Sequence, residues 1–468
     1  MKILLLNLPQ NIYDVSDYAS LLPPYGLALL SSCLKQAGYD VTLLDAFAHQ
    51  IRLGELVKYV LKVKPKVLGI SIMTPGLAQT TQFLSFIKKE LPETITITGG
   101  VHPTVEYESM LRNHKAIDIA VIGEGEETIV ELAERISHGE PIDSVAGIAY
   151  RSNGEIKANI NRALVQDLDS LPFGDWGSLP MSRYWDRWMI KKNYCLMLLS
   201  RGCPYYCTFC GHSIIGKKYR KRSPAMIMEE IKLLYDKYGV RNISFGDSTV
   251  NIDNAWLREI CDRLLGLKRK ILWGCSLRAD RVDRQDLKLM KKSGCVKVFI
   301  GVESADERML KKMKKAESFS HIEEGIRVIQ EAGLTPDMGF IIGMPGETRE
   351  SIMKTINFTR RFNKSVCSFT YATPYPGTEF YNTAKNEGFT VSDWSKFNTF
   401  SLAYVPHGFN EDEIRHYFKL AVKSTYLRIP FLIAQLLNVR SWTNFWVNAC
   451  FAYRLFFKVI SRKNNKIN

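Results

Sequence analysis

The chain has 468 residues, which at about 100 to 200 residues per domain implies two to four domains. Hydrophobic residues make up 46% and charged residues 24% of the sequence, a mixture that excludes disordered, collagen-like and coiled-coil chains. The 63 lysines and arginines exceed the 48 aspartates and glutamates and give a net charge of +15. This charge favours anionic small molecules, nucleic acid or an anionic membrane surface without choosing among them.

The N-terminal sequence MKILLLNLPQ has one lysine and a short apolar run that stops at Asn7, too short for the core of a signal peptide. We therefore expect a cytoplasmic protein. Ten cysteines are too few for a disulfide scaffold in a chain of this length. Three of them lie close together between residues 203 and 210, which in a reducing compartment indicates a metal site.

Apolar runs alternate with amphipathic segments over residues 2 to 137. Five of these runs are typical of buried strands: KILLL, YDVTLLD, VLGISIM, TITITGG and IDIAVIG. A helix is expected near Pro24 to Ala37, with Gly38 where the chain must leave it. The pattern predicts an α/β fold that begins with a doubly wound, Rossmann-like parallel sheet over residues 1–140.

Residues 145 to 158 predict a β-hairpin around Asn153 and Gly154, and we interpret residues 141–190 as hairpin and linker. Six further strand and helix units between residues 191 and 400 predict an open, partial (β/α)6 barrel. The functional residues of such a barrel are expected at the carboxyl ends of its strands.

From about Asn410 the sequence becomes helical, aromatic and basic, and residues 401–468 are expected to form a C-terminal helical region. The stretch from 429 to 457 contains too many polar residues for a membrane span of about 20 apolar residues. It can form a packed cap or an interfacial helix that contacts a membrane peripherally.

The basic run KKYRKR, residues 217–222, precedes Ser223 and Pro224, which are typical of a helix cap and a first helical turn. We interpret the run as a solvated loop, with phosphate binding as the alternative.

The sequence RGCPYYCTFC places Cys203, Cys207 and Cys210 directly after an apolar strand. Three thiolates at this spacing can bind three irons of a [4Fe-4S] cluster and leave the fourth iron open to a substrate or cofactor. The alternative is a zinc site, with His212 as its fourth ligand.

This motif at the first strand of a partial barrel resembles the radical S-adenosylmethionine enzymes, over about residues 194 to 387. The resemblance implies that S-adenosylmethionine binds the open iron and is cleaved to a 5'-deoxyadenosyl radical. It places one adenosyl or methionine contact near each strand end, at Phe209 and Ile341 (adenine), Asp247 (amino group), Glu303 (ribose), and Arg278 and Asp280 (carboxylate). Glu347 falls one place away from the position of the family's glutamate.

The N-terminal half, together with the barrel, resembles the cobalamin-binding subgroup of these enzymes, through PPYGLALLSSCLKQAGYDVTLLD, SIM, GGVHPT and GEGEE. The resemblance implies a cobalamin site at the strand ends, formed by Ser71, Gly99, Gly100, His102, Gly123 and Glu124. The two adjacent glycines would let a bulky nucleotide tail approach the backbone. No D-x-H-x-x-G loop is present, so we expect no histidine on cobalt, and His102 is interpreted as structural or as lying near the corrin edge.

The common reaction of this subgroup is methylation of an unactivated carbon or phosphorus. The resemblance therefore predicts a methyltransferase with a [4Fe-4S] cluster, S-adenosylmethionine and cobalamin, acting on a small molecule or lipid. Its electron donor would be a low-potential protein such as flavodoxin or ferredoxin. The alternatives are a cobalamin-dependent radical oxidoreductase or cyclase, a cobalamin-binding module with a structural cluster, and a tRNA-modifying enzyme. The last is disfavoured because no RNA-binding appendage is evident.

Overall fold

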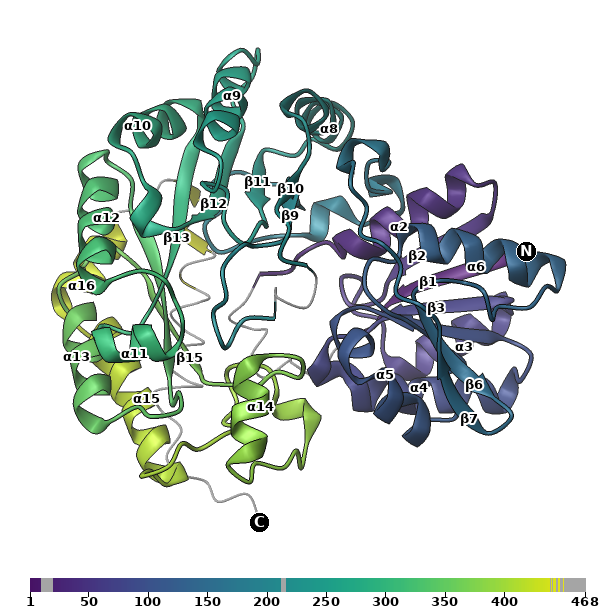
Figure 1. Cartoon of the computed structure of the whole chain (residues 1–468). Coiled ribbons are helices and arrows are strands. Elements are labelled where there is room, and N and C mark those ends of the chain that lie inside the picture. The colour runs from purple at the N-terminus through teal and green to yellow at the C-terminus, as the bar shows by residue number, and fades with distance from the viewer. Residues whose placement is uncertain are drawn as a thin grey trace.

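The computed structural model describes residues 1–9, 20–211 and 216–437, and the single positions 439, 441, 442, 445, 446 and 449. Two α/β units lie side by side, the N-terminal one in purple and blue and the second in teal and green (Figure 1). His212 and residues 450–468 of the expected C-terminal region lie outside the described residues.

The N-terminal unit is built on a seven-stranded sheet in the order β2-β1-β3-β4-β5-β6-β7. Its first five strands are parallel and correspond to the five predicted apolar runs: β1 (Lys2–Asn7), β2 (Asp40–Asp45), β3 (Val67–Ser71), β4 (Ile95–Gly99) and β5 (Ile119–Val121). The connecting helices are α2 (Tyr25–Gln36), α3 (Leu53–Val63), α4 (Leu77–Glu90), α5 (Val101–Asn113) and α6 (Glu126–His138). The predicted Rossmann-like sheet is therefore confirmed.

Both faces of this sheet are covered, which explains why its strands read as apolar runs. Ile3 and Leu5 of β1 pack with α2 and α6, whereas Leu4 and Leu6 pack on the opposite face with α3, α4 and α5. All four of these side chains are at most 2% exposed.

The predicted hairpin forms β6 (Ile148–Ser152) and β7 (Glu155–Ala158). Asn153 and Gly154 at its turn both have positive φ, 52° and 82°, as a tight Asn-Gly hairpin requires. The hairpin is more than a linker, because β6 pairs antiparallel with β5 and extends the N-terminal sheet.

The segment after the hairpin joins the two units. The carboxylate of Asp175 accepts hydrogen bonds from Ser31 and Lys35 of α2, both at 2.7 Å. The indole of the neighbouring Trp176 donates to Glu230 of the second unit at 2.9 Å. Two adjacent residues thus tie the first helix of one unit to the first helix of the other.

The second unit is a six-stranded parallel sheet in the order β15-β14-β13-β12-β11-β8, the predicted partial barrel. Its strands are β8 (Tyr194–Met197), β11 (Asn242–Phe245), β12 (Leu272–Leu277), β13 (Cys295–Glu303), β14 (Pro336–Ile342) and β15 (Cys367–Tyr371). Its helices are α8 (Pro224–Tyr238), α9 (Asn254–Leu265), α10 (Arg284–Ser293), α11 (Glu307–Lys312), α12 (Phe319–Glu331), α13 (Arg349–Thr359) and α14 (Glu379–Asn386). A short antiparallel ribbon of β9 (Ser200–Arg201) and β10 (Arg220–Lys221) follows β8.

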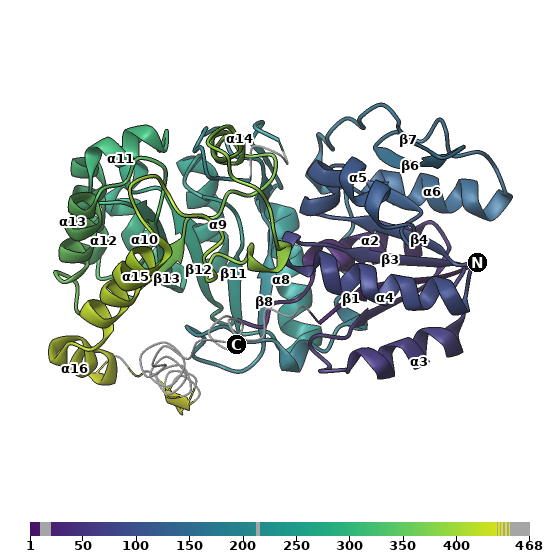
Figure 2. The ribbon, with the colours of Figure 1, turned by 90° about the horizontal axis from the view of Figure 1, so that it is seen from below.

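Two C-terminal helices, α15 (Glu411–Tyr426) and α16 (Ile429–Leu437), lie on the side of the barrel away from the N-terminal unit (Figures 1 and 2). Phe418 stacks on Tyr371 with ring centroids 4.1 Å apart, and the Tyr426 hydroxyl donates to the Cys367 carbonyl at 2.9 Å. Among the described residues no single helix has the length and apolar character of a membrane span. Only α15 and α16 together reach them, and they are bent by 55°.

Candidate active site

The cysteine loop begins at Gly202, where β9 ends. Its φ of +82° suits glycine, and a Cβ there would overlap the carbonyl oxygen of Lys218. The loop then presents Cys203, Cys207 and Cys210, all three half-buried. The backbone at Gly202 therefore lies close against the backbone at Lys218, and this contact positions the start of the cysteine loop.

Backbone hydrogen bonds hold the middle of this loop against the barrel. The N–H of Thr208 donates to the Met313 carbonyl after α11, and the Thr208 carbonyl accepts from Phe380 of α14, both at 2.9 Å. In the described part of the chain no three His, Cys, Asp or Glu side chains converge on a single ion. The thiolates of a [4Fe-4S] cluster bind different irons, so this donor set suits a cluster without such convergence.

Lys315 places a buried positive charge near the loop. Burial raises the pKa of Cys207 to about 11, and the Lys315 ammonium opposes that rise. The same ammonium lies 3.2 Å from Glu317 and 3.7 Å from Glu303. An anionic thiolate cluster at the loop would therefore face a buried cation.

Arg278 connects the end of β12 to the cysteine loop. Its guanidinium makes two 3.0 Å hydrogen bonds to the Asp280 carboxylate and donates to the carbonyls of Lys315 and Ala316 at 3.2 and 3.0 Å. It also lies over the ring of Tyr205, 3.6 Å from the centroid. Arg278 and Asp280 are thus held together beside the loop, with most of the guanidinium N–H groups already engaged.

Asp247 holds the chain between β8 and the cysteine loop. Its carboxylate accepts from the Leu199 N–H at 3.2 Å and from the Ser200 hydroxyl, and burial raises its pKa to about 6. Glu303 ends β13 with a φ of +66°, a strained conformation for a residue other than glycine, and burial raises its pKa as well. Both carboxylates lie at strand ends.

Phe209 and Ile341 pack against the same cluster although they are distant in the sequence. Both pack against one apolar cluster, formed by Met309, Met313, Met344, Ala372, Phe380, Ala384 and Tyr404. Glu347 does not reach outward from the next loop, because its buried carboxyl group accepts hydrogen bonds from the backbone N–H groups of Gly343 and Met344 at 2.5 and 3.2 Å. It stabilises its own turn.

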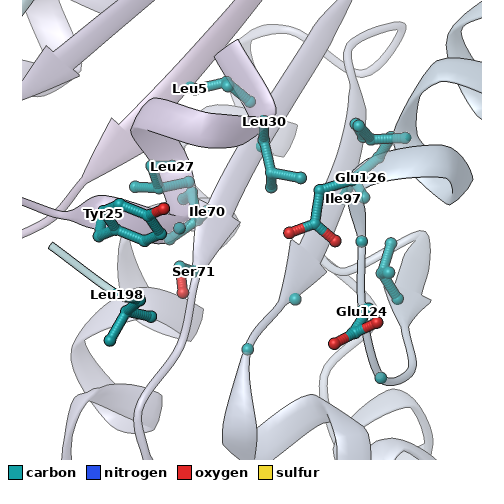
Figure 3. A pocket seen from close by; sticks show the side chains of 18 of the residues that line it. Leu5, Tyr25, Leu27, Leu30, Ile70, Ser71, Ile97, Glu124, Glu126 and Leu198 are labelled. Atoms are coloured by element: carbon teal, nitrogen blue, oxygen red, sulfur yellow. The ribbon is translucent and has the colours of Figure 1, made fainter. Parts of the chain in front are cut away.

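A second site lies in the N-terminal unit, where a cavity of about 260 Å³ opens at the strand ends (Figure 3). Five of the six candidate cobalamin residues line it: Ser71, Gly99, Gly100, Gly123 and Glu124. Gly100 has a φ of +100°, and a Cβ there would come within 2.9 Å of the Ser71 hydroxyl and 3.0 Å of the Ile72 carbonyl. The glycine therefore lets the ends of β3 and β4 approach each other closely at the cavity wall.

His102 does not line this cavity. Its side chain is 1% exposed and packs edge-on against Trp394, with ring centroids 5.1 Å apart. Burial lowers its pKa to about 4, which keeps the imidazole neutral at physiological pH. Of the two interpretations, the structural one fits this position.

Glu124 lies in the cavity wall but is already engaged by arginines of the second unit. Its two oxygens accept from the two terminal nitrogens of Arg220 at 2.9 and 2.8 Å, and Arg201 lies 3.0 Å away. Arg201 also pairs with Glu126 at 2.5 Å. Arg201, Arg220 and Glu126 were not identified from the sequence, because neither their pairing nor their burial leaves a local pattern.

The interpretation of residues 217–222 as a solvated loop is wrong for Arg220 and Arg222. Each is 4% exposed, Arg220 paired with Glu124 and Arg222 with Glu230. Arg220 and Lys221 form the two-residue strand β10, in which Arg220 is buried and Lys221 exposed, and Arg222 directly after it is buried again.

Comparison with known proteins identifies both units. The chain matches the model of the radical SAM superfamily over residues 197–359 and that of the B12 binding domain over residues 14–133. It is 31% identical to an uncharacterized methyltransferase, PH0819, of Pyrococcus horikoshii, over 92% of this chain and 94% of that protein. It is 26% identical to the anaerobic magnesium-protoporphyrin IX monomethyl ester cyclase of Rubrivivax gelatinosus, over 92% and 79% of the two chains.

Two solved structures share the fold. The cobalamin-dependent S-adenosylmethionine radical enzyme OxsB, with aqua-cobalamin and S-adenosylmethionine bound, superposes with a TM-score of 0.74 at 17% identity, over 98% of this chain and 71% of that one. The methyltransferase TsrM of Kitasatospora setae, with cobalamin and a [4Fe-4S] cluster bound, gives a TM-score of 0.70 at 15% identity, over 97% and 98%.

Proposed function

The chain belongs to the cobalamin-binding radical S-adenosylmethionine enzymes, and from this premise we propose that it transfers a methyl group from S-adenosylmethionine to an unactivated carbon of a small molecule or lipid. The cofactors of this family are a [4Fe-4S] cluster, S-adenosylmethionine and cobalamin. Bound together, they supply a carbon-centred radical and a carrier for the methyl group. The named methyltransferases among the relatives support methyl transfer over the other reactions of the family.

One observation carries this proposal: the barrel contributes directly to the wall of the cobalamin cavity. Leu198 and Arg201, from the segment that leads into the cysteine loop, line it together with residues of the N-terminal sheet. Apolar side chains from both units line it, among them Leu27 and Ile70 of the N-terminal unit and Leu198 of the barrel (Figure 3). A methyl carrier and a radical source would thus be neighbours, as transfer between reactive centres requires.

The residues assigned to S-adenosylmethionine are part of the same proposal. Phe209 and Ile341 share an apolar cluster suited to an adenine ring, and Arg278 with Asp280 lies beside the cysteine loop. Cys203, Cys207 and Cys210 would hold the cluster.

The test uses the products of S-adenosylmethionine. The full chain is reconstituted anaerobically with iron, sulfide and hydroxocobalamin and given a reductant and methyl-labelled S-adenosylmethionine. We expect 5'-deoxyadenosine from one S-adenosylmethionine and S-adenosylhomocysteine from another. About one S-adenosylhomocysteine should form per bound cobalamin, because without a substrate each cobalamin can accept only one methyl group. Protein reconstituted without cobalamin should form 5'-deoxyadenosine alone.

The same assay distinguishes methyl transfer from the alternative function, that of a cobalamin-dependent radical oxidoreductase or cyclase. The name of one relative, a cyclase, suggests this alternative. If cobalamin-loaded protein forms 5'-deoxyadenosine but no S-adenosylhomocysteine, methyl transfer is wrong and the runner-up replaces it.

We further propose that an acidic, low-potential flavodoxin or ferredoxin reduces the cluster from the side of Tyr206. Tyr206 lies between Cys203 and Cys207 in the sequence and is 59% exposed. The Lys217 ammonium lies over its ring, 4.0 Å from the centroid. Lys311 and Lys312 of α11 are exposed and, within the described residues, pair with no acidic side chain. The variant K311E/K312E should slow reduction by flavodoxin and leave reduction by dithionite unchanged; equal rates with flavodoxin would refute this surface.

We also propose that the protein is cytoplasmic and contacts an anionic membrane peripherally through α16. Its outer face carries apolar side chains that are 47% to 82% exposed, Ile429, Leu432, Ile433, Leu436 and Leu437. Three basic residues lie beside α16. Arg428 directly precedes the helix and donates to the Arg360 carbonyl, and Gln435 of the helix donates to the Lys364 carbonyl. Apolar groups beside cations are typical of helices that lie in an anionic lipid interface.

Flotation with anionic liposomes tests this contact. The full chain should float at low salt and less at high salt, and the variant L436E/L437E should float less than the wild type. These two side chains are 69% and 82% exposed, so the substitutions should leave the fold intact. If wild type and variant float equally, or neither floats, α16 is not a membrane contact.

A further inference from the structure

Arg201 belongs to both sites at once. It lies on β9, two residues before Cys203, and it also lines the cobalamin cavity. Its side chain is 14% exposed and reaches across the boundary between the units to Glu124 at 3.0 Å and Glu126 at 2.5 Å. A single guanidinium therefore joins the loop of the cluster cysteines to the wall of the other cofactor's cavity.

The contact is reinforced by the neighbouring strand. Arg220 pairs directly with Arg201 in the β9–β10 ribbon, and its guanidinium grips the same Glu124 carboxylate with two hydrogen bonds of 2.9 and 2.8 Å. Glu124 also accepts from the Val165 N–H at 2.8 Å. Because Glu124, Arg201 and Arg220 are all nearly buried, the ribbon cannot shift without breaking charged hydrogen bonds that water does not replace.

Glu126 lines the cavity, and only one of its two carboxylate oxygens is engaged by Arg201. The residue is 7% exposed, and its second carboxylate oxygen has no hydrogen-bond partner among the described residues although it is fully buried. Figure 3 shows the Glu126 carboxylate among the side chains that line the cavity, together with Tyr25 and Leu198. A buried, unpartnered carboxylate oxygen is costly, so the cavity offers an acceptor to a ligand that carries N–H donors.

Cobalamin carries such donors, since primary amides surround its corrin ring. We propose that the free Glu126 oxygen accepts a hydrogen bond from an amide of cobalamin, and that Arg201 couples this contact to the cysteine loop, so that cobalamin binding and cluster assembly favour each other. This inference rests on the proposed cobalamin site. In this arrangement Glu126 is a binding residue and Arg201 a positioning residue. By linkage, each cofactor changes the affinity of the other by the same factor.

The test is a measurement of cobalamin affinity rather than of turnover. The dissociation constant of hydroxocobalamin is determined for the full chain with and without its reconstituted cluster. In the wild type we expect the cluster to lower the constant at least about fivefold, the lower end of usual coupling between sites. In the variant R201A the ratio should fall to about one, whereas R201K, which keeps the charge but cannot bridge two carboxylates equally well, should lie between.

The variant E126A examines the ligand contact separately. Loss of a charged hydrogen bond should weaken cobalamin binding about tenfold or more, and because the coupling passes through this contact, the ratio should also fall towards one. The matched control is R162A, because Arg162 pairs with Glu131 of the same helix α6 but does not line the cavity. It should leave both the affinity and the ratio unchanged.

Two results would overturn the inference: a wild-type ratio of one, or a ratio in R201A equal to that of the wild type. If R201A does not fold, R201K and E126A still test the inference. A wild-type ratio of dissociation constants in R201K, together with wild-type affinity for cobalamin in E126A, would contradict the coupling. Failure of the coupling is distinguishable from failure of the proposed function, since wild-type protein would still form S-adenosylhomocysteine from S-adenosylmethionine.

Discussion

At the scale of single residues, the proposed function depends first on the three cysteines of the loop, which are proposed to hold the cluster. Alanine at Cys203, Cys207 or Cys210 should abolish the [4Fe-4S] absorption and the formation of 5'-deoxyadenosine, because two thiolates do not hold the cluster with one open iron. Absorption spectra and product analysis of the anaerobically reconstituted variants check this. The control C261A changes a buried cysteine of α9 and should retain both signals; four irons bound by a loop variant would refute the assignment.

The raised pKa of Glu347 predicts how the free energy of unfolding changes with pH. Burial raises its pKa to about 8, so between pH 4.5 and 8 the native state holds a proton that the unfolded chain has released. The contribution of this group to the free energy of unfolding is therefore fully present below about pH 4.5 and is lost as the pH rises through 8. The variant E347Q cannot ionise. Between pH 6 and 8.5 it should lose less free energy of unfolding than the wild type, by on the order of 1–2 kcal/mol.

Urea denaturation at the two pH values measures this difference. The exposed Glu350 of α13 supplies the control, since E350Q should show the pH dependence of the wild type. An E347Q variant with an unchanged pH dependence would show that this carboxyl is not buried as described.

The residues of the two sites differ in how far the sequence alone predicts them. The cysteine motif is local, so its spacing sufficed to predict a metal site. Glu124, predicted to bind cobalamin at the strand ends, lines the cavity there. Its engagement by Arg201 and Arg220 was not predictable, because those partners follow far along the chain and are brought in by the fold. The burial of His102 behind Trp394 depends on a similarly distant contact.

At the scale of elements, the turn from β4 into α5 depends on one glycine. Gly100 has positive φ and no room for a Cβ, so G100A should destabilise the chain by more than about 1 kcal/mol and reduce the cobalamin retained. Gly54 in α3 offers the opposite case, with open space around its Cβ position. G54A should stabilise by about 0.5–1 kcal/mol. Thermal unfolding compares the two, and equal effects would contradict this account of the turn.

The strands of both units were predictable because burial on two faces makes each one a continuous apolar run. The hairpin was predictable from Asn153 and Gly154, but its pairing with β5 was not, since any exposed sheet edge accepts a strand. The short β9–β10 ribbon escaped prediction because strands of two residues leave no recognisable alternation.

At the scale of the whole molecule, the two units are joined by specific polar contacts rather than by the chain alone. Asp175 and Trp176 connect α2 to α8, and Arg201 and Arg220 connect the cysteine ribbon to Glu124. These contacts place the cobalamin cavity against the segment that leads to the cluster cysteines. The central claim is therefore that one chain holds both cofactors side by side.

The most direct measurement of that claim is the cofactor content of a single monodisperse preparation. After anaerobic reconstitution with iron, sulfide and hydroxocobalamin and removal of unbound material, the full chain should contain about four irons and about one cobalamin per polypeptide. Omitting one cofactor should leave the other bound. Protein that retains four irons but no cobalamin, or cobalamin without a cluster when both are supplied in excess, would contradict the account.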